Sequence, residues 1–163
     1  MCVLCHNPSE NDAGRRTSAA DKGTTPQAIN FALMVHKIHT GEKLAEAGQS
    51  YMIVGFGGSH NEFNDVRYPA MSPNGSTGDT AKCYMCHVKS SETVFPIGKN
   101  DVRDPQGLMN PAPATTSACT ACHFDKSVFA HANSNYDPKY GESCDVCHAA
   151  GKEFDVDKVH AGK

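Results

Sequence analysis

The stretch Cys119-Thr120-Ala121-Cys122-His123 is one of four copies of the pattern C-x-x-C-H in a chain of 163 residues. All 8 cysteines belong to these copies, and a histidine follows the second cysteine of each one. This repeat is the attachment motif of c-type haem, and we expect it to decide the fold as well as the chemistry. The other copies are Cys2-Val3-Leu4-Cys5-His6, Cys83-Tyr84-Met85-Cys86-His87 and Cys144-Asp145-Val146-Cys147-His148.

Each motif has the spacing that one covalently bound haem requires. The two thiols add to the two vinyl groups of the porphyrin, and the imidazole binds iron as the proximal ligand. A four-thiolate zinc site would leave the adjacent histidines without a role, and a disulfide framework would not place histidine after every pair. The sequence therefore predicts four haem c groups with the proximal ligands His6, His87, His123 and His148, attached to Cys2, Cys5, Cys83, Cys86, Cys119, Cys122, Cys144 and Cys147.

The composition indicates that the chain needs a large cofactor to build a core. Hydrophobic residues make up 39% of the sequence and tryptophan is absent, so the protein part of the core is thin for this length. Four haems, or one for about every 41 residues, would supply much of the apolar interior. We expect one tetrahaem module over residues 1–163, mainly α, with long ordered loops, little sheet and a core packed around haem.

Hydropathy and charge exclude other classes of protein. No apolar run approaches the roughly 20 residues of a membrane-spanning helix. The formal net charge of -3, without a basic block, argues against a nucleic-acid partner. With about 8 propionates and about 4 oxidised irons the charge becomes about -7. Since c-type haem is attached outside the cytoplasm, we expect an exported protein whose signal segment is not in this sequence.

Five further histidines are candidates for the distal side of the irons. Each haem iron has a sixth position after the proximal histidine has bound, and a second imidazole commonly fills it. Methionine is the competing ligand, with Met34, Met71 and Met85 among the 6 available, although filling gaps in apolar contacts is its more common use. The candidate distal ligands are His36, His39, His60, His131 and His160.

His36 and His39 lie in a segment whose pattern predicts a helix over residues 25–40. Thr25 is the expected N-cap and Gly41 the expected C-terminal stop. Spacings of three and four residues place both imidazoles on one apolar face. Because two rings on the same face cannot bind opposite sides of one iron, we expect them to bind two different haems.

His131 and His160 are expected to bind haems from the C-terminal part of the chain. His131 follows His123 by eight residues, on one expected helix that begins near Ser117. Eight residues are about 12 Å of helical rise, so these two rings cannot bind the same iron. His131 is therefore predicted to serve the haem of another motif. His160 is predicted to fold back onto a haem from a short tail.

The five distal candidates exceed the four predicted irons by one. Either one of these histidines is not a ligand, or a fifth haem is attached by sequence outside this chain. Met1 stands directly before Cys2, so the chain begins at a haem motif, which favours the second explanation. The sequence thus predicts a tetrahaem part of a pentahaem-type module.

Several runs resemble the OmcA/MtrC family of decahaem outer-membrane cytochromes. They are the double-histidine run 34–42, the run 58–63 around His60, and residues 66–69 before the second motif. The order of the motifs down to His160 is also similar. The resemblance covers essentially the whole chain and implies one C-terminal pentahaem module without its first haem motif. It also implies two histidine ligands for every haem, which would give all five distal candidates a role.

The resemblance implies extracellular electron transfer. The partners it implies are redox partner cytochromes or a porin–cytochrome complex on one side, and ferric minerals or flavins on the other. The implied location is the cell surface at the outer membrane, with the periplasm as the alternative. A neighbouring haem module or subunit is a further expected partner.

Coordination chemistry indicates an electron-transfer protein rather than an enzyme. Six-coordinate iron leaves no position for a substrate, and two histidine ligands favour low reduction potentials. No catalytic residue is expected, because metal oxides can be reduced by outer-sphere transfer at a haem edge. The first alternative is a multihaem reductase with one five-coordinate haem. The second is a filament subunit whose haems stack across subunit boundaries.

Overall fold

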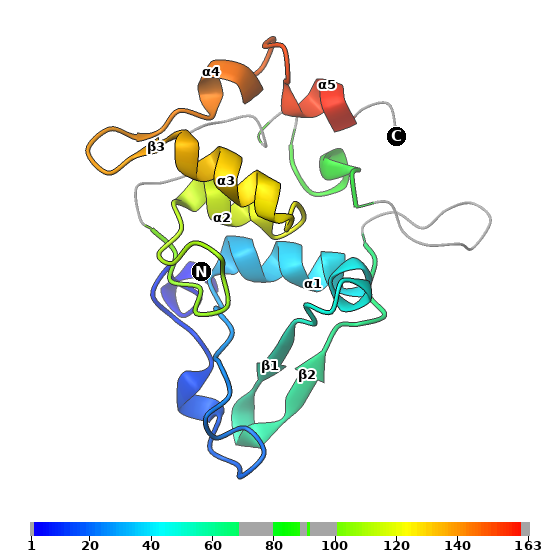
Figure 1. Ribbon diagram of the computed structural model, residues 1–163. Helices are drawn as coiled ribbons and strands as arrows, with labels where there is room; N and C mark the ends of the chain where they lie inside the picture. The colour runs from blue at the N-terminus through cyan, green and yellow to red at the C-terminus, as the bar shows by residue number, and fades with distance from the viewer. Residues whose placement is uncertain (1, 69–79, 89–90, 92–100, 161–163) are drawn as a thin grey trace, which may run out of the picture.

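The computed structural model describes residues 2–68, 80–88, 91 and 101–160 (Figure 1). Helix α1 (Phe31–Glu46) crosses the middle of the molecule, and α2 (Ala114–Thr120) and α3 (Lys126–Ser134) lie on one side of it. The short helices α4 (Asp145–His148) and α5 (Val156–His160) lie beyond them, at the top of the figure. No helix in these ranges is long and apolar enough to cross a membrane.

The strands in the described ranges form two short antiparallel hairpins. β1 (Met52–Val54) pairs with β2 (His60–Glu62) below α1, and β3 (Tyr136–Asp137) pairs with β4 (Gly141–Glu142) beside α4. Ile53 lies opposite Asn61 in the first hairpin. Single 3₁₀ turns cover Cys2–Leu4, Ala13–Arg15, Phe56–Gly58 and Cys83–Met85.

The helix that carries His36 and His39 begins and ends later than its sequence pattern predicts. Asn30 caps it, because its side-chain oxygen accepts a hydrogen bond from the Leu33 N–H at 3.2 Å. The helix then continues past Gly41 to Glu46. The predicted bounds of 25–40 are therefore wrong at both ends, although both histidines do lie on one helix.

The helix continues through Gly41, and at this point α1 comes so close to a following loop that there is no room for a side chain. The carbonyl oxygen of Phe63 occupies the place that a Cβ of Gly41 would take. One residue later, the N–H of Glu42 donates to the carbonyl oxygen of Val66 at 2.9 Å. The missing side chain thus lets the loop after β2 lie directly on α1.

Replacing Gly41 with alanine is expected to lower the free energy of unfolding by about 1–3 kcal/mol, the usual cost of overpacking. The new methyl group would overlap the Phe63 backbone, which cannot rotate away as a side chain can. Gly14→Ala is the matched control, because nothing lies near a Cβ at that position. Denaturant unfolding of the haem-loaded variants measures the free energy of unfolding of Gly41→Ala and of Gly14→Ala. Equal losses for the two variants would contradict the close approach at Gly41.

A buried ion pair organises the part of the molecule around β1 and β2. Arg16 donates from Nε and Nη2 to the two carboxylate oxygens of Asp12, at 2.8 and 2.7 Å. The same carboxylate accepts the backbone N–H groups of Gln27 (2.8 Å) and Val54 (2.9 Å). Asp12 and Arg16 are only 2% and 8% exposed. One carboxylate therefore joins three segments of the chain.

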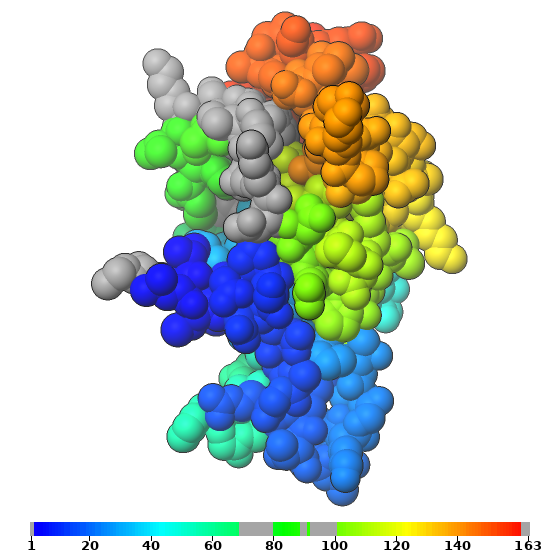
Figure 2. Space-filling model, turned by 90° about the vertical axis from the view of Figure 1, so that its left-hand side faces the viewer, coloured from blue at the N-terminus to red at the C-terminus, as the bar shows by residue number. Residues whose placement is uncertain are grey.

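The buried apolar residues of the described ranges are few, and Leu33 and Leu44 of α1 are among them. One cluster of these residues consists of Ala28, Leu33, Val102 and Ala121. Figure 2 shows the N-terminal segment packed against the residues that lead into α2, and there the Arg103 N–H donates to the carbonyl oxygen of Pro8 at 2.8 Å. The N-terminal motif and the third motif are thus parts of one packed body.

Candidate haem-binding sites

The four C-x-x-C-H motifs share one local structure. In each, the backbone N–H of the histidine donates to the carbonyl oxygen of the first cysteine at 2.9 Å. This bond closes one helical turn, which holds two thiols and an imidazole in a fixed relation. The bonds join His6 to Cys2, His87 to Cys83, His123 to Cys119 and His148 to Cys144.

Six of the nine histidines form three facing pairs, each with one proximal and one distal candidate. The ring centroids are 6.1 Å apart for His36–His87, 6.0 Å for His123–His160 and 6.2 Å for His131–His148. A metal–imidazole nitrogen bond is about 2 Å, and a ring centroid lies about 1 Å beyond the nitrogen. Two axial imidazoles on one metal thus have centroids about 6 Å apart. The three separations fit axial ligands of one iron each.

Several of these rings are oriented by a hydrogen bond from Nδ1 to a backbone carbonyl oxygen. Because a carbonyl oxygen can only accept, Nδ1 carries the proton, and Nε2 keeps the lone pair that binds a metal. Histidine ligands of metals are commonly held in this way. The bonds run from His36 to Ala32 (2.8 Å), from His160 to Val156 (2.7 Å) and from His148 to Phe154 (3.1 Å).

The electrostatic surroundings of His36 favour the neutral imidazole. Burial lowers its pKa, the hydrogen bond to Ala32 opposes this shift, and the neighbouring His87 and His39 lower the pKa further. Burial also lowers the pKa of His39. Only the neutral ring has a lone pair for iron, so both rings are kept in the form that can bind it.

The remaining three histidines have other neighbours. His6 donates from Nδ1 to the carbonyl oxygen of Ile29 at 2.9 Å, which leaves its Nε2 free. The His39 ring lies 4.8 Å from the Tyr68 ring, and the Nε2 of His60 lies 3.0 Å from a carboxylate oxygen of Asp21. Among the described residues, none of the three faces another histidine ring. Their roles as ligands stay predictions.

His123 and His131 do not lie on one helix. α2 ends at Thr120, within the third motif, and α3 begins at Lys126. The prediction of one helix from near Ser117 is wrong, because the closed turn of the motif takes the chain out of α2. The two rings nevertheless face different partners, since His131 faces His148.

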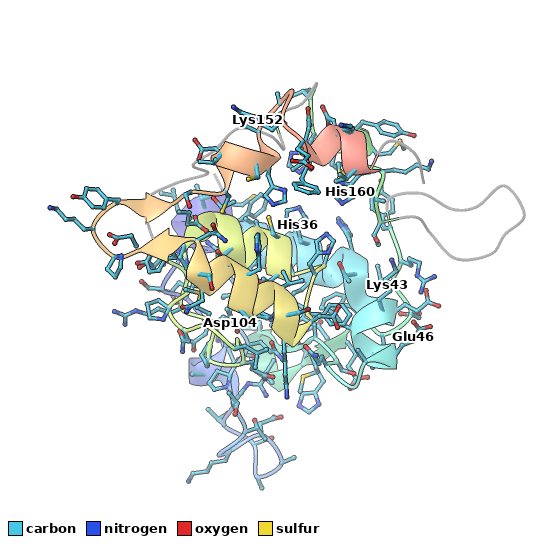
Figure 3. All side chains as sticks on the ribbon, turned by 45° about the horizontal axis from the view of Figure 1, so that its top comes forward. His36, Lys43, Glu46, Asp104, Lys152 and His160 are labelled. Carbon is cyan, nitrogen blue, oxygen red and sulfur yellow. The ribbon has the colours of Figure 1, made fainter. Side chains whose placement is uncertain are left out.

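The histidine pairs cross between the third and fourth motifs. His131 follows the third motif in the chain but faces His148 of the fourth. His160 follows the fourth motif but faces His123 of the third. Figure 3 shows His160 on α5 in the upper part of the view, above His36 of α1. The two C-terminal segments thus exchange their candidate distal ligands.

The donor set of the chain fits haem better than a bare metal ion. None of the eight cysteines forms a disulfide, and the Thr40 hydroxyl on α1 lies 2.8 Å from the sulfur of Cys122. Across the described ranges, no three His, Cys, Asp or Glu side chains are arranged to hold a metal ion by themselves. A haem iron needs only two axial ligands from the protein, since the porphyrin supplies the other four nitrogens.

Comparison with known proteins identifies one family. A sequence model described as outer membrane cytochrome MtrC/MtrF-like, domains II/IV, matches residues 1–161. The crystal structure of the outer membrane decahaem cytochrome OmcA is similar with 22% sequence identity and a TM-score of 0.39. That match covers 98% of this chain and 23% of the OmcA chain. No curated protein matches the chain.

Proposed function

The chain belongs to the MtrC/MtrF-like family of outer membrane cytochromes, in its domains II/IV, and on this premise we propose that it passes electrons through bis-histidine haems to acceptors outside the cell. The family places the protein at the outer membrane, on the cell surface. The proposed acceptors are ferric minerals or flavins, and the proposed donors are redox partner cytochromes or a porin–cytochrome complex.

The three facing histidine pairs carry this proposal. They support a haem on Cys83 and Cys86 with the axial pair His87–His36. They equally support the pair His123–His160 for the third motif and His148–His131 for the fourth. The fourth haem is proposed on Cys2 and Cys5, with His6 as its proximal ligand. In this proposal the haems make up most of the core.

The proposed ligation suits electron transfer rather than chemistry on a bound substrate. Haem c supplies a one-electron iron couple when bound. The protein's part is to fill both axial positions, so that no substrate can reach the metal, and to favour low potentials by using two imidazoles. α1 contributes His36 and His39 from one helix, so the haems that they bind would lie close together.

We expect four haems per chain, and low-spin signals of different shape from the three paired sites. The two rings of His36–His87 are nearly parallel, at 11°, whereas those of His131–His148 are nearly perpendicular, at 79°. Parallel ligand planes split the iron d orbitals rhombically, and perpendicular planes remove much of that splitting. Haem quantification followed by low-temperature paramagnetic resonance of the oxidised protein measures both. Fewer than four haems, or three paired sites with one uniform signal, would contradict the proposed ligation.

A further inference from the structure

Glu142 joins the segments of the third and fourth motifs through its carboxylate. It lies on β4, two residues before Cys144. One carboxylate oxygen accepts the backbone N–H of Thr115 at 2.9 Å. The other accepts the backbone N–H of Thr116 at 2.7 Å and its hydroxyl at 2.6 Å. Both threonines lie in the first turn of α2, the helix that ends in the third motif, so one side chain connects two haem-binding segments.

The charge of Glu142 lies close to attachment cysteines of both motifs. The sulfur of Cys144 is 4.0 Å from one of its carboxylate oxygens. Cys119 lies one helical turn beyond Thr115 and Thr116. Although Cys119 reaches solvent, protein surrounds its sulfur on most sides. Before haem is attached, this burial raises the pKa of the thiol to about 12, and the charges of Cys144 and Glu142 add to the shift.

Neutral donors, and no cation, hold the Glu142 carboxylate. Its hydrogen bonds come from two backbone N–H groups and one hydroxyl, and in the described part of the chain no lysine or arginine forms an ion pair with it. Within the described ranges, its negative charge is thus offset by hydrogen bonds alone and not by a positively charged side chain. Oxidised haem iron carries one more positive charge than reduced iron, so a fixed negative charge nearby stabilises the oxidised state.

We propose that Glu142 is a positioning residue that fixes the spacing of the third and fourth haem-binding segments and lowers the reduction potentials of both haems. This inference rests on the proposed attachment of haem at those two motifs. A unit charge at roughly 10 Å, with an effective dielectric constant of about 20, changes the ratio of reduced to oxidised haem about tenfold. That ratio corresponds to a shift of about 59 mV for a one-electron couple.

The test compares Glu142→Gln with Glu153→Gln in the haem-loaded chain. Both variants lose one carboxylate charge near the fourth motif, but Glu153 is exposed, so water and salt screen it. Spectroelectrochemical titration should show that two of the four reduction potentials rise in Glu142→Gln. At a fixed applied potential, the ratio of reduced to oxidised haem at these two sites should increase about tenfold. Glu153→Gln should leave all four close to their original values.

A third variant, Glu142→Asp, separates the effect of the charge from the effect of the hydrogen bonds to α2. It keeps the negative charge but is one methylene shorter, so it should lose hydrogen bonds to α2 while the two potentials stay lower than in Glu142→Gln. Four unchanged potentials in Glu142→Gln, or equal shifts in Glu153→Gln, would overturn the inference while the haem count stays at four. A wild-type count below four would instead overturn the proposed function, and the two failures are thus distinguishable.

Discussion

Replacing His160 with alanine is expected to convert one haem in four, the haem of the third motif, from low-spin to high-spin iron. His160 stands beyond the fourth motif in the chain, but its ring faces His123 at 6.0 Å. Without it, that iron keeps one axial imidazole and becomes five-coordinate. Paramagnetic resonance of the oxidised protein measures the high-spin fraction. Added free imidazole should restore the low-spin signal.

Two further variants show which haem His160 serves. Lys158→Ala removes an exposed side chain from the same short helix and should leave all haems low-spin. In a background with Cys144→Ser and Cys147→Ser, which removes the fourth haem, His160→Ala should still add one high-spin haem. If the effect of His160→Ala disappears in that background, His160 serves the fourth motif and the crossed pairing is wrong.

Replacing Asp12 with alanine is expected to destabilise the β1–β2 region by about 3–5 kcal/mol, because it leaves the buried Arg16 without its charge partner. It also removes the acceptor for the N–H groups of Gln27 and Val54. Amide hydrogen exchange of the haem-loaded chain measures the loss of local stability residue by residue. Protection should fall over residues 12–30 and in the hairpin.

Asp65→Ala is the matched control, since Asp65 is exposed and its loss should change stability by no more than about 0.5 kcal/mol. Asp12→Asn keeps an oxygen acceptor but loses the charge. Its loss of stability should lie between those of Asp12→Ala and Asp65→Ala. Unchanged exchange of the hairpin in Asp12→Ala would mean that covalent haem, rather than this carboxylate, holds the region together.

The sequence predicts the family correctly, as the match over residues 1–161 confirms. The four attachment motifs are predicted from fixed residue types at a fixed local spacing, and the haems on them stay a prediction. A local pattern also suffices to place His36 and His39 on one helix. The N-terminal bound fails because Asn30, and not Thr25, caps the helix, although the bond from Leu33 to Asn30 is local. The C-terminal bound fails because Gly41 meets the Phe63 backbone, a contact between segments that the local pattern does not contain.

The pairing of histidines could not be predicted, because it depends on contacts between distant segments. Neither of the C-terminal pairs joins rings that are nearest in sequence: His131 faces His148, and His160 faces His123. The carbonyl oxygens that orient the rings belong to the backbone and have no residue-type signature. Glu142 gave no signal either, since a single glutamate before a motif is common and its bonds to α2 are tertiary.

The crossed pairs between the third and fourth motifs have a consequence for how such chains can evolve and be re-engineered. If each of these two segments completes the coordination of the other's iron, neither can be deleted, duplicated or transplanted alone without leaving a metal under-coordinated. Residues 114–160 are then the smallest inheritable unit, and it carries two haems. A chain of haems of this kind could then be lengthened or shortened at this end only by two haems at a time.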